Sequence, residues 1–170
     1  TNTVDDDPRT LPSPLTDGAI VSAASTGESN LTANVSGLTL FNAAVGQTSR
    51  VGDVTTDAGA GSTTTVRANF SATKMDFGDA VLIDGSTPVT LNASTSSTTE
   101  GIRFRQGLTG PGDTIVLSAP NATIISNGNV GSSTDRFAAI SVHGRNMILG
   151  GNVFAEGDIS LAIGTSSNDT

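Results

Sequence analysis

The sequence predicts an all-β protein, a parallel β-helix (β-solenoid) of about seven coils with an extended N-terminal arm. A repeated phrase is the first reason: residues 123–130 (TIISNGNV) return 23 positions later as residues 146–153 (NMILGGNV), with apolar, Gly, Asn and Val positions aligned without a gap. A period of twenty-odd residues, rich in β-branched side chains, indicates one supersecondary unit stacked on copies of itself. Gly-Asp forms a second recurring phrase, beginning at residues 52, 78, 112 and 157.

Composition is the second reason. Only 35% of the residues are hydrophobic, and the chain has one Lys, three Glu and no Trp, Tyr or Cys. Thr, Ser, Asn, Gly and Ala dominate the remainder. Apart from Ala, these residues suit strands and turns better than helices, and other good helix formers such as Lys and Glu are scarce. We therefore expect almost no helix.

Alternation of apolar and polar residues is the third reason. Apolar residues fall at every second position in residues 31–36, 66–71, 102–105 and 140–143. Period two means that each strand has one buried and one wet face. Phe41, Phe70 and Phe104 fall on expected strands, where stacking in the interior would explain them. An antiparallel β-sandwich is the alternative fold, but it would show hairpin signals about 8–12 residues apart and no long period.

The chain divides into two parts. Residues 1–17 form an extended arm that carries Asp5, Asp6 and Asp7 and three prolines, Pro8, Pro12 and Pro14. Closely spaced prolines forbid helix and favour extended backbone. Residues 18–170 form a single β-solenoid domain. The arm is either a solvated linker or a segment that lies on a neighbouring subunit.

Three runs resemble a known family: residues 40–46 (LFNAAVG), 51–59 (VGDVTTDAG) and 77–82 (FGDAVL). They are similar in rhythm to the strand repeats of giant bacterial surface proteins of the filamentous-haemagglutinin type. This resemblance, over roughly residues 31–163, implies a right-handed parallel β-helix exported to the cell surface. The chain departs from the family in being short.

Charge and motifs exclude several classes of function. Sixteen acidic against eight basic residues give a net charge of −8, without the basic stripe that nucleic-acid binding needs. No apolar run is long enough to span a membrane. The one histidine, His143, is predicted to point outward, near Arg145, and no nucleophile, phosphate-loop or zinc motif is present. We expect a protein that is not an enzyme; a polysaccharide-lyase-like β-helix enzyme is the second alternative.

We expect no cofactor, and a structural calcium ion is the one exception that the sequence leaves open. Asp5, Asp6 and Asp7, the pair Asp76 and Asp79, and the pair Asp53 and Asp57 could each offer oxygen ligands. The EF-hand spacing and the glycine-rich calcium repeat are both missing.

Six Asn-x-Ser/Thr sequons are glycosylation candidates if the chain passes through a glycosylating export route. They begin at Asn30, Asn34, Asn69, Asn92, Asn121 and Asn168. Abundant Ser and Thr, scarce Lys and an acidic charge favour an extracellular or cell-surface location.

The expected function is structural. A solenoid has two open ends that invite pairing with another chain unless they are capped. Here Ile159, Leu161 and Ile163 form a good strand near the C-terminus, and no capping helix is visible at either end. With the proline-spaced arm, this predicts a subunit of a surface or biofilm-matrix filament that binds copies of itself head to tail by β-strand addition. The first alternative is an adhesin segment that binds a glycan or a host protein.

Overall fold

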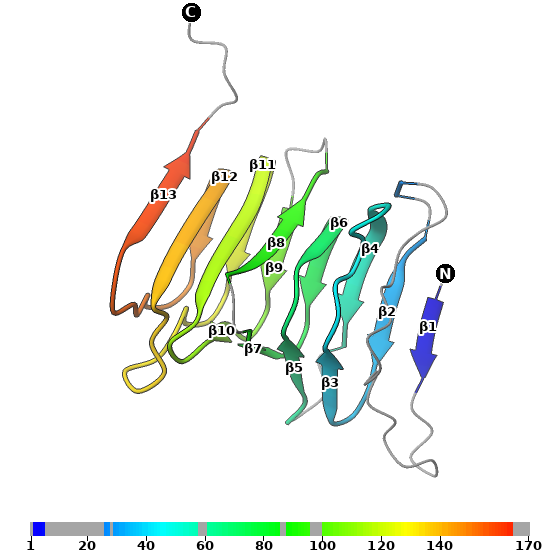
Figure 1. Ribbon diagram of the computed structural model, residues 1–170, viewed down its shortest axis with the longest axis horizontal. Helices are drawn as coiled ribbons and strands as arrows, with labels where there is room; N and C mark the ends of the chain where they lie inside the picture. Colours follow the sequence, from blue (N-terminus) through cyan, green and yellow to red (C-terminus); the bar gives the residue numbers. More distant parts are fainter. Residues whose placement is uncertain are drawn as a thin grey trace, which may run out of the picture.

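The computed structural model describes residues 2–5 (backbone only), 26–27, 29–57, 61–85, 88–95 and 100–164. These residues contain no helix, and their strands stack in parallel as a β-solenoid of about 5 turns. Figure 1 shows the stack from the side, with the N-terminal strand at one end and the C-terminal strand at the other. The parallel β-helix is confirmed, and the antiparallel sandwich is wrong because every strand pair in the described residues is parallel.

The expectation of about seven coils is too high. One column of paired residues runs through Leu31, Val54, Met75, Ile102, Ile124 and Met147, so each turn takes 21 to 27 residues. Seven coils would need nearly the whole chain to be coiled at a constant length. Instead the turns vary in length, and residues 6–25 and 165–170 lie outside the described part of the chain.

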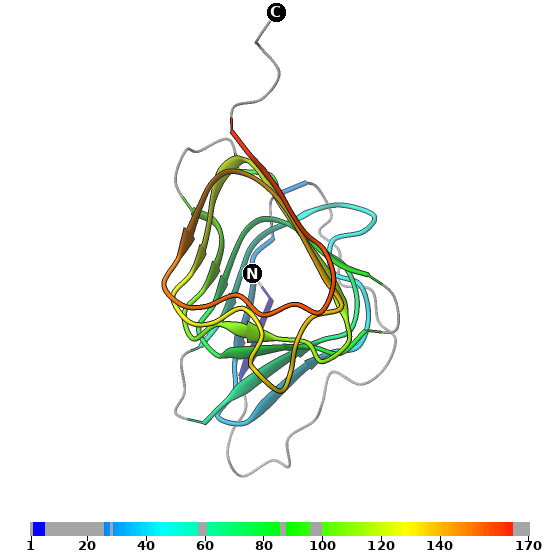
Figure 2. The ribbon, with the colours of Figure 1, turned by 90° about the vertical axis from the view of Figure 1, so that its left-hand side faces the viewer.

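Each turn has three walls. Seen along the stack in Figure 2, the coils outline a three-sided ring. The first wall consists of β1 (Asn2–Asp5), β2 (Leu31–Asn34), most of β4 (Val51–Thr56), the second half of β6 (Phe70–Phe77), β9 (Glu100–Phe104) and the second halves of β11 (Thr114–Ser126) and β12 (Ala139–Leu149). The backbone of β1 pairs in parallel with β2, so the start of the predicted arm belongs to the stack.

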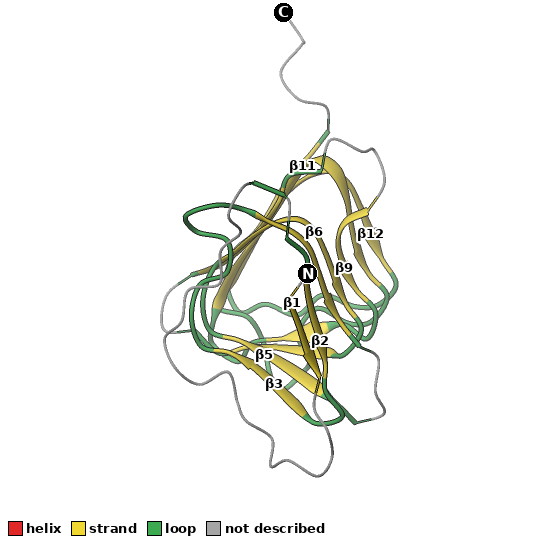
Figure 3. Ribbon diagram, turned by 90° about the vertical axis from the view of Figure 1, so that its right-hand side faces the viewer, coloured by secondary structure: helices red, strands yellow, loops and turns green. Residues whose placement is uncertain are grey.

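The second wall consists of β3 (Leu38–Phe41), β5 (Thr63–Val66), β7 (Ala80–Ile83) and β10 (Leu108–Thr109). Isolated bridges continue it through Val130 and Val153. Figure 3, which shows the opposite end of the stack, places β3 and β5 on the side facing away from β11. The third wall consists of the first part of β6, β8 (Val89–Ala93), the first halves of β11 and β12, and β13 (Ile159–Ile163).

The repeated phrase marks one structural position in two successive turns. Thr123 pairs with Asn146, Ile124 with Met147, Ile125 with Ile148 and Ser126 with Leu149. The polar half of the phrase is also aligned, because the Asn152 N–H donates to Asn129 Oδ1 at 2.9 Å and Val130 bridges Val153. The residues that match in the sequence repeat are therefore the residues that pair between the two turns.

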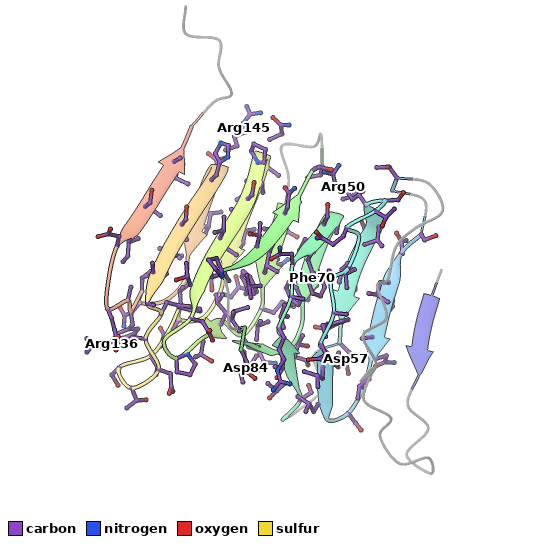
Figure 4. All side chains as sticks on the ribbon, in the orientation of Figure 1. Arg50, Asp57, Phe70, Asp84, Arg136 and Arg145 are labelled. Carbon is purple, nitrogen blue, oxygen red and sulfur yellow. The ribbon has the colours of Figure 1, made fainter. Side chains whose placement is uncertain are left out.

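Aromatic stacking fills the interior. Phe41, Phe70, Phe77 and Phe104 form a column with ring centroids 5.0, 6.3 and 5.4 Å apart, and the rings of the last pair are stacked nearly parallel, at 6°. Figure 4 places Phe70 in the middle of the stack. All four side chains are at most 4% exposed, so the predicted interior position of Phe41, Phe70 and Phe104 is confirmed. Phe77 and Phe137 are equally buried and were not predicted.

The Gly-Asp phrase is not a coil repeat. Gly78 and Asp79 lie between the first and second walls, Gly112 and Asp113 precede the third wall, and Gly52 lies inside β4. At Gly52, Gly78 and Gly157 a neighbouring turn comes too close for a side chain: a Cβ on Gly78 would lie 2.3 Å from the carbonyl oxygen of Asp57. Gly112 has open space around it but a φ of 75°, a backbone conformation that favours glycine.

We predict that Phe77→Ala lowers the free energy of unfolding by ~3–5 kcal/mol, because it opens a cavity inside the aromatic column. Chemical denaturation followed by circular dichroism measures the change. Phe154→Ala is the matched control, since Phe154 is only partly buried and lies outside the column, and it should cost less. Equal losses for the two variants would contradict the role of the column.

Candidate functional site: the open C-terminal coil

The last strand of the stack has an unpaired edge. β13 pairs in parallel with β12, from Ile140 opposite Ile159 to Gly144 opposite Ile163. It stands at the end of the sheet order, and no other described residue pairs with its far edge. An exposed edge of this kind presents backbone N–H and C=O groups that can add another strand.

The same strand exposes side chains that belong inside the solenoid. Ile159 and Leu161 take the positions that Ile140 and Val142 hold one turn earlier. The earlier pair is 2% and 1% exposed, whereas Ile159 is 47% and Leu161 is 55% exposed. Ile163, opposite the buried Gly144, is 43% exposed. Within the described part of the chain, no further turn covers these core positions.

The apolar surface extends around the whole last turn. Leu149, at the inward position that Ser126 holds one turn earlier, is 42% exposed. Met147, Val153 and Ala155 are only partly buried where they pack on the core. Five of the six exposed large hydrophobic side chains in the described part of the chain belong to this turn. We call Leu149, Val153, Ala155, Ile159, Leu161 and Ile163 the open coil; the ribbon of this turn faces the viewer in Figure 2.

At the other end of the stack, β1 lies on β2, and β3 has one edge that no described residue pairs. Leu38 on β3 is 54% exposed. Of the predicted self-assembly residues, Ile159, Leu161 and Ile163 are therefore located on the open coil. Pro8, Pro12 and Pro14 lie outside the described residues.

The calcium candidates do not converge. Asp76 lies on the outer face of β6, between the buried Met75 and Phe77, and both of its oxygens accept from Arg105: Oδ1 from Nε at 2.9 Å and Oδ2 from Nη2 at 2.7 Å. The hydrogen bond and charge of Arg105, helped by Arg103 and Lys74, lower the pKa of Asp76 although partial burial opposes them. A calcium ion at Asp76 would have to displace this arginine.

Unlike Asp76 on the outer face, Asp79 is fully buried. Its carboxylate accepts from the Ser62 hydroxyl and, at 2.9 Å, from Thr64 Oγ1, both on the preceding turn. Burial raises the pKa of Asp79 above its ordinary value of 3.8, while the hydroxyl donors oppose the rise. This burial could not be predicted from the sequence, because the partners lie 17 and 15 residues away rather than one regular turn.

The other acidic candidates stay apart as well. Asp53 is exposed, and Asp57 Oδ1 accepts from the Val35 N–H at 3.3 Å. Only the backbone of Asp5 is described, and Asp6 and Asp7 lie outside the described residues. Across the described residues, no group of three or more His, Cys, Asp or Glu side chains is arranged to hold a metal ion.

The sequon asparagines fall into two groups. Asn30 and Asn69 hold the next turn in place, because their Oδ1 atoms accept from the N–H groups of Asp53 and Thr90, each at 2.8 Å. Asn34 and Asn121 are exposed, and Asn92 is partly buried on β8. Asn168 lies outside the described residues. An N-linked glycan would therefore meet least resistance at Asn34 and Asn121.

His143 lies on the outer face of β12 and is exposed, as predicted; Arg145, two residues further along the strand, is exposed as well. Figure 4 shows Arg145 at the rim of the stack. Among the described residues, neither the His143 nor the Arg145 side chain forms a hydrogen bond or an ion pair.

Comparisons with known proteins add no relative: no protein-family model, no curated protein and no solved structure matches the chain. The described residues also contain no helix long and apolar enough to cross a membrane. What is established is the architecture, a stack of parallel coils of the kind found in β-helix repeat proteins.

We predict that Asp79→Asn changes the pH dependence of stability. Because the folded-state pKa of Asp79 lies above its ordinary value of 3.8, the native protein holds this proton more tightly than the unfolded chain does. Asp79 therefore makes the wild type lose stability as pH rises from 3.8 through the raised pKa, and the variant should lack this loss. Free energies of unfolding at a series of pH values measure it.

Asp53→Asn is the control for this pH experiment. It removes the same charge from an exposed carboxyl group and should keep the wild-type slope. If Asp79→Asn and the wild type show parallel curves, the carboxyl group of Asp79 is not the source of the pH dependence.

Proposed function

We propose that this protein is a non-enzymatic structural subunit that assembles head to tail, the open coil of one copy receiving the first turn of the next. The observation that carries the proposal is the contrast within one column of the core: Val142 is 1% exposed, and its counterpart Leu161 is 55% exposed. A soluble chain that leaves several inward-facing core positions open at one end gains stability when another turn covers them.

Strand addition would use two features at once. The free edge of β13 supplies main-chain donors and acceptors, and the apolar side chains of the open coil set the register of the incoming strand. The incoming surface would be the opposite end of a second copy, which ends in β1 and the free edge of β3. Two different surfaces then meet, so the contact is heterologous and propagates into a filament instead of closing.

The free energy gained at such a junction can be compared with the cost of association. Complete burial of a large aliphatic side chain contributes ~1.5–3 kcal/mol, and these side chains are about half exposed, so each would contribute about 1 kcal/mol. New main-chain hydrogen bonds add ~0.5–1.5 kcal/mol each. Association costs ~4–15 kcal/mol in lost translational and rotational freedom. The gain is of the same order as this cost, so we expect assembly that depends on protein concentration.

Composition supports an extracellular site of action. The net charge of −8, the single Lys and the absence of Cys suit a surface or matrix protein that needs no disulfide. The resemblance in repeat rhythm to filamentous-haemagglutinin-type surface proteins, together with the stacked parallel coils, supports the same proposal.

We predict that Leu161→Asp prevents filament formation, because a carboxylate would be buried without a partner at the subunit junction. Negative-stain electron microscopy and light scattering of the protein at neutral pH measure assembly. Uniform filaments are expected for the wild type and dispersed short rods for the variant.

Ser160→Asp is the matched control, since Ser160 is the adjacent residue on β13 and alternation places it on the outer face. This variant should still form filaments. Equal assembly of the two aspartate variants, or dispersed rods for the wild type at high concentration, would overturn the proposal.

A second prediction concerns the N-terminal arm. Deleting residues 1–17 should abolish polymerisation, because it removes β1 and the proline-spaced segment that would meet the open coil. The circular dichroism signal of β-sheet should remain, because β1 contributes only 4 residues. Unchanged filaments after the deletion would show that the arm takes no part in the junction.

A further inference from the structure

A polar groove lies at the corner where the second wall turns into the third. It is open to solvent, has a volume of about 620 Å³ and is lined by Asn42, Arg67, Asp84, Gly85, Pro111 and Asp113. Volumes of this order are typical of sites for small ligands. Figure 4 places Asp84 at the edge of the stack, away from Phe70 in its interior. The groove is therefore on the flank of the solenoid and separate from the open coil.

Strand register builds the groove. Phe41, Val66 and Ile83 end β3, β5 and β7 and are paired in register. The residue that follows each of them is Asn42, Arg67 and Asp84, so these three side chains come from equivalent corners of successive turns. Two backbone bonds fix the corner: Arg67 N–H to the Phe41 carbonyl oxygen at 3.0 Å, and Asp84 N–H to the Val66 carbonyl oxygen at 3.1 Å. Neighbouring groups are then about 4.8 Å apart along the axis.

The central pair keeps hydrogen-bonding capacity for a ligand. Arg67 Nε and Nη2 both donate to the same oxygen, Asp84 Oδ2, at 2.8 and 2.6 Å. Within the described residues, Asp84 Oδ1 and Arg67 Nη1 make no further hydrogen bond. The Arg67 and Asp84 side chains are 44% and 51% exposed. The two side chains therefore hold each other in place while about half of each stays exposed.

Asp113 supplies a second carboxylate from the next turn. The Gly85 N–H donates a hydrogen bond to it, and partial burial together with the negative charge of Asp84 raises the pKa of Asp113. The two carboxylates and one guanidinium leave the groove with a small negative charge. With a net charge of −8 on the whole chain, this disfavours phosphate, sulfate and uronate ligands.

We propose that this corner groove binds an uncharged saccharide chain lying along the solenoid axis. Adjacent sugar hydroxyls can donate to the carboxylates of Asp84 and Asp113, while Arg67 and the Asn42 amide can donate to hydroxyl and ring oxygens. The lining contains no apolar side chain larger than Pro111, so an apolar ligand has little to contact. Equivalent groups on successive turns suit a ligand with its own axial repeat.

Isothermal titration calorimetry of the full chain tests the proposal, with neutral hexasaccharides of glucose, galactose and N-acetylglucosamine and one uronate hexasaccharide as probes. We expect at least one neutral probe to bind and the uronate probe to bind more weakly. Arg67→Gln and Asp84→Asn should each weaken binding about tenfold or more, because each removes a charge-assisted hydrogen bond.

Asp76→Asn is the control, because it breaks another Arg–Asp pair, Asp76 with Arg105, on a different wall; the Arg105 side chain is 48% exposed and the Asp76 side chain 13%. Its affinity should stay within about twofold of the wild type. The proposal is overturned if no neutral probe binds at millimolar concentration, if the groove variants bind as the wild type does, or if calcium chloride alone is the ligand that Asp84→Asn affects. Electron microscopy of Asp84→Asn should still show filaments, which separates failure here from failure of the assembly proposal.

Discussion

Parallel pairing between turns, in a constant register along each wall, is the constraint on which the rest of this structure depends. A strand that bonds to the turns before and after it places each side chain directly over its counterpart. The Phe77 and Phe104 rings stack because Phe77 and Phe104 are paired residues. The same register brings Asn129 to the backbone of Asn152 and Asn69 to that of Thr90. Core, corners and outer faces are thus all consequences of one pairing rule.

The pairing rule also makes the ends of the stack unlike its middle. Inside the stack, each inward side chain is covered by a turn on both sides, and each backbone edge is used. In the last turn both conditions fail together, since β13 has a free edge and Ile159, Leu161 and Ile163 are exposed. Hydrophobic residues at such an edge reinforce the tendency of the free backbone to pair. Such an end differs from an ordinary apolar patch, because its strand edge and inward side chains specify that the covering group is another parallel strand.

Features that depend on which residues pair between turns could be predicted from the sequence. Features that depend on the length and course of the individual turns could not. Residues 123–130 and 146–153 predicted the pairing residue by residue, because a β-solenoid converts sequence repeats directly into stacking. Alternation likewise predicted the inward positions of Phe41, Phe70 and Phe104. The number of turns was wrong because turns of 21 to 27 residues do not share one length.

Residues at the corners could not be predicted to lie together, again because the turns differ in length. Asn42, Arg67 and Asp84 are 25 and 17 residues apart, a spacing that suggests no repeat until the register of β3, β5 and β7 is known. Asp79 was named as a possible calcium ligand, and its burial could not be predicted because its partners Ser62 and Thr64 are likewise out of step with the period.

The two proposals use different parts of the solenoid, and their combination has a physical consequence. Assembly uses the ends of the axis, while the groove of Asn42, Arg67, Asp84 and Asp113 lies on the flank and would stay accessible in a filament. Each added subunit would then bring one more groove at a fixed axial spacing. A shallow polar groove gives weak binding on its own, but linked sites on one polymer raise the effective concentration for each further contact. A filament of this protein could therefore hold a long saccharide firmly although a single subunit holds it weakly, and the end contacts would set the strength of recognition on the flank.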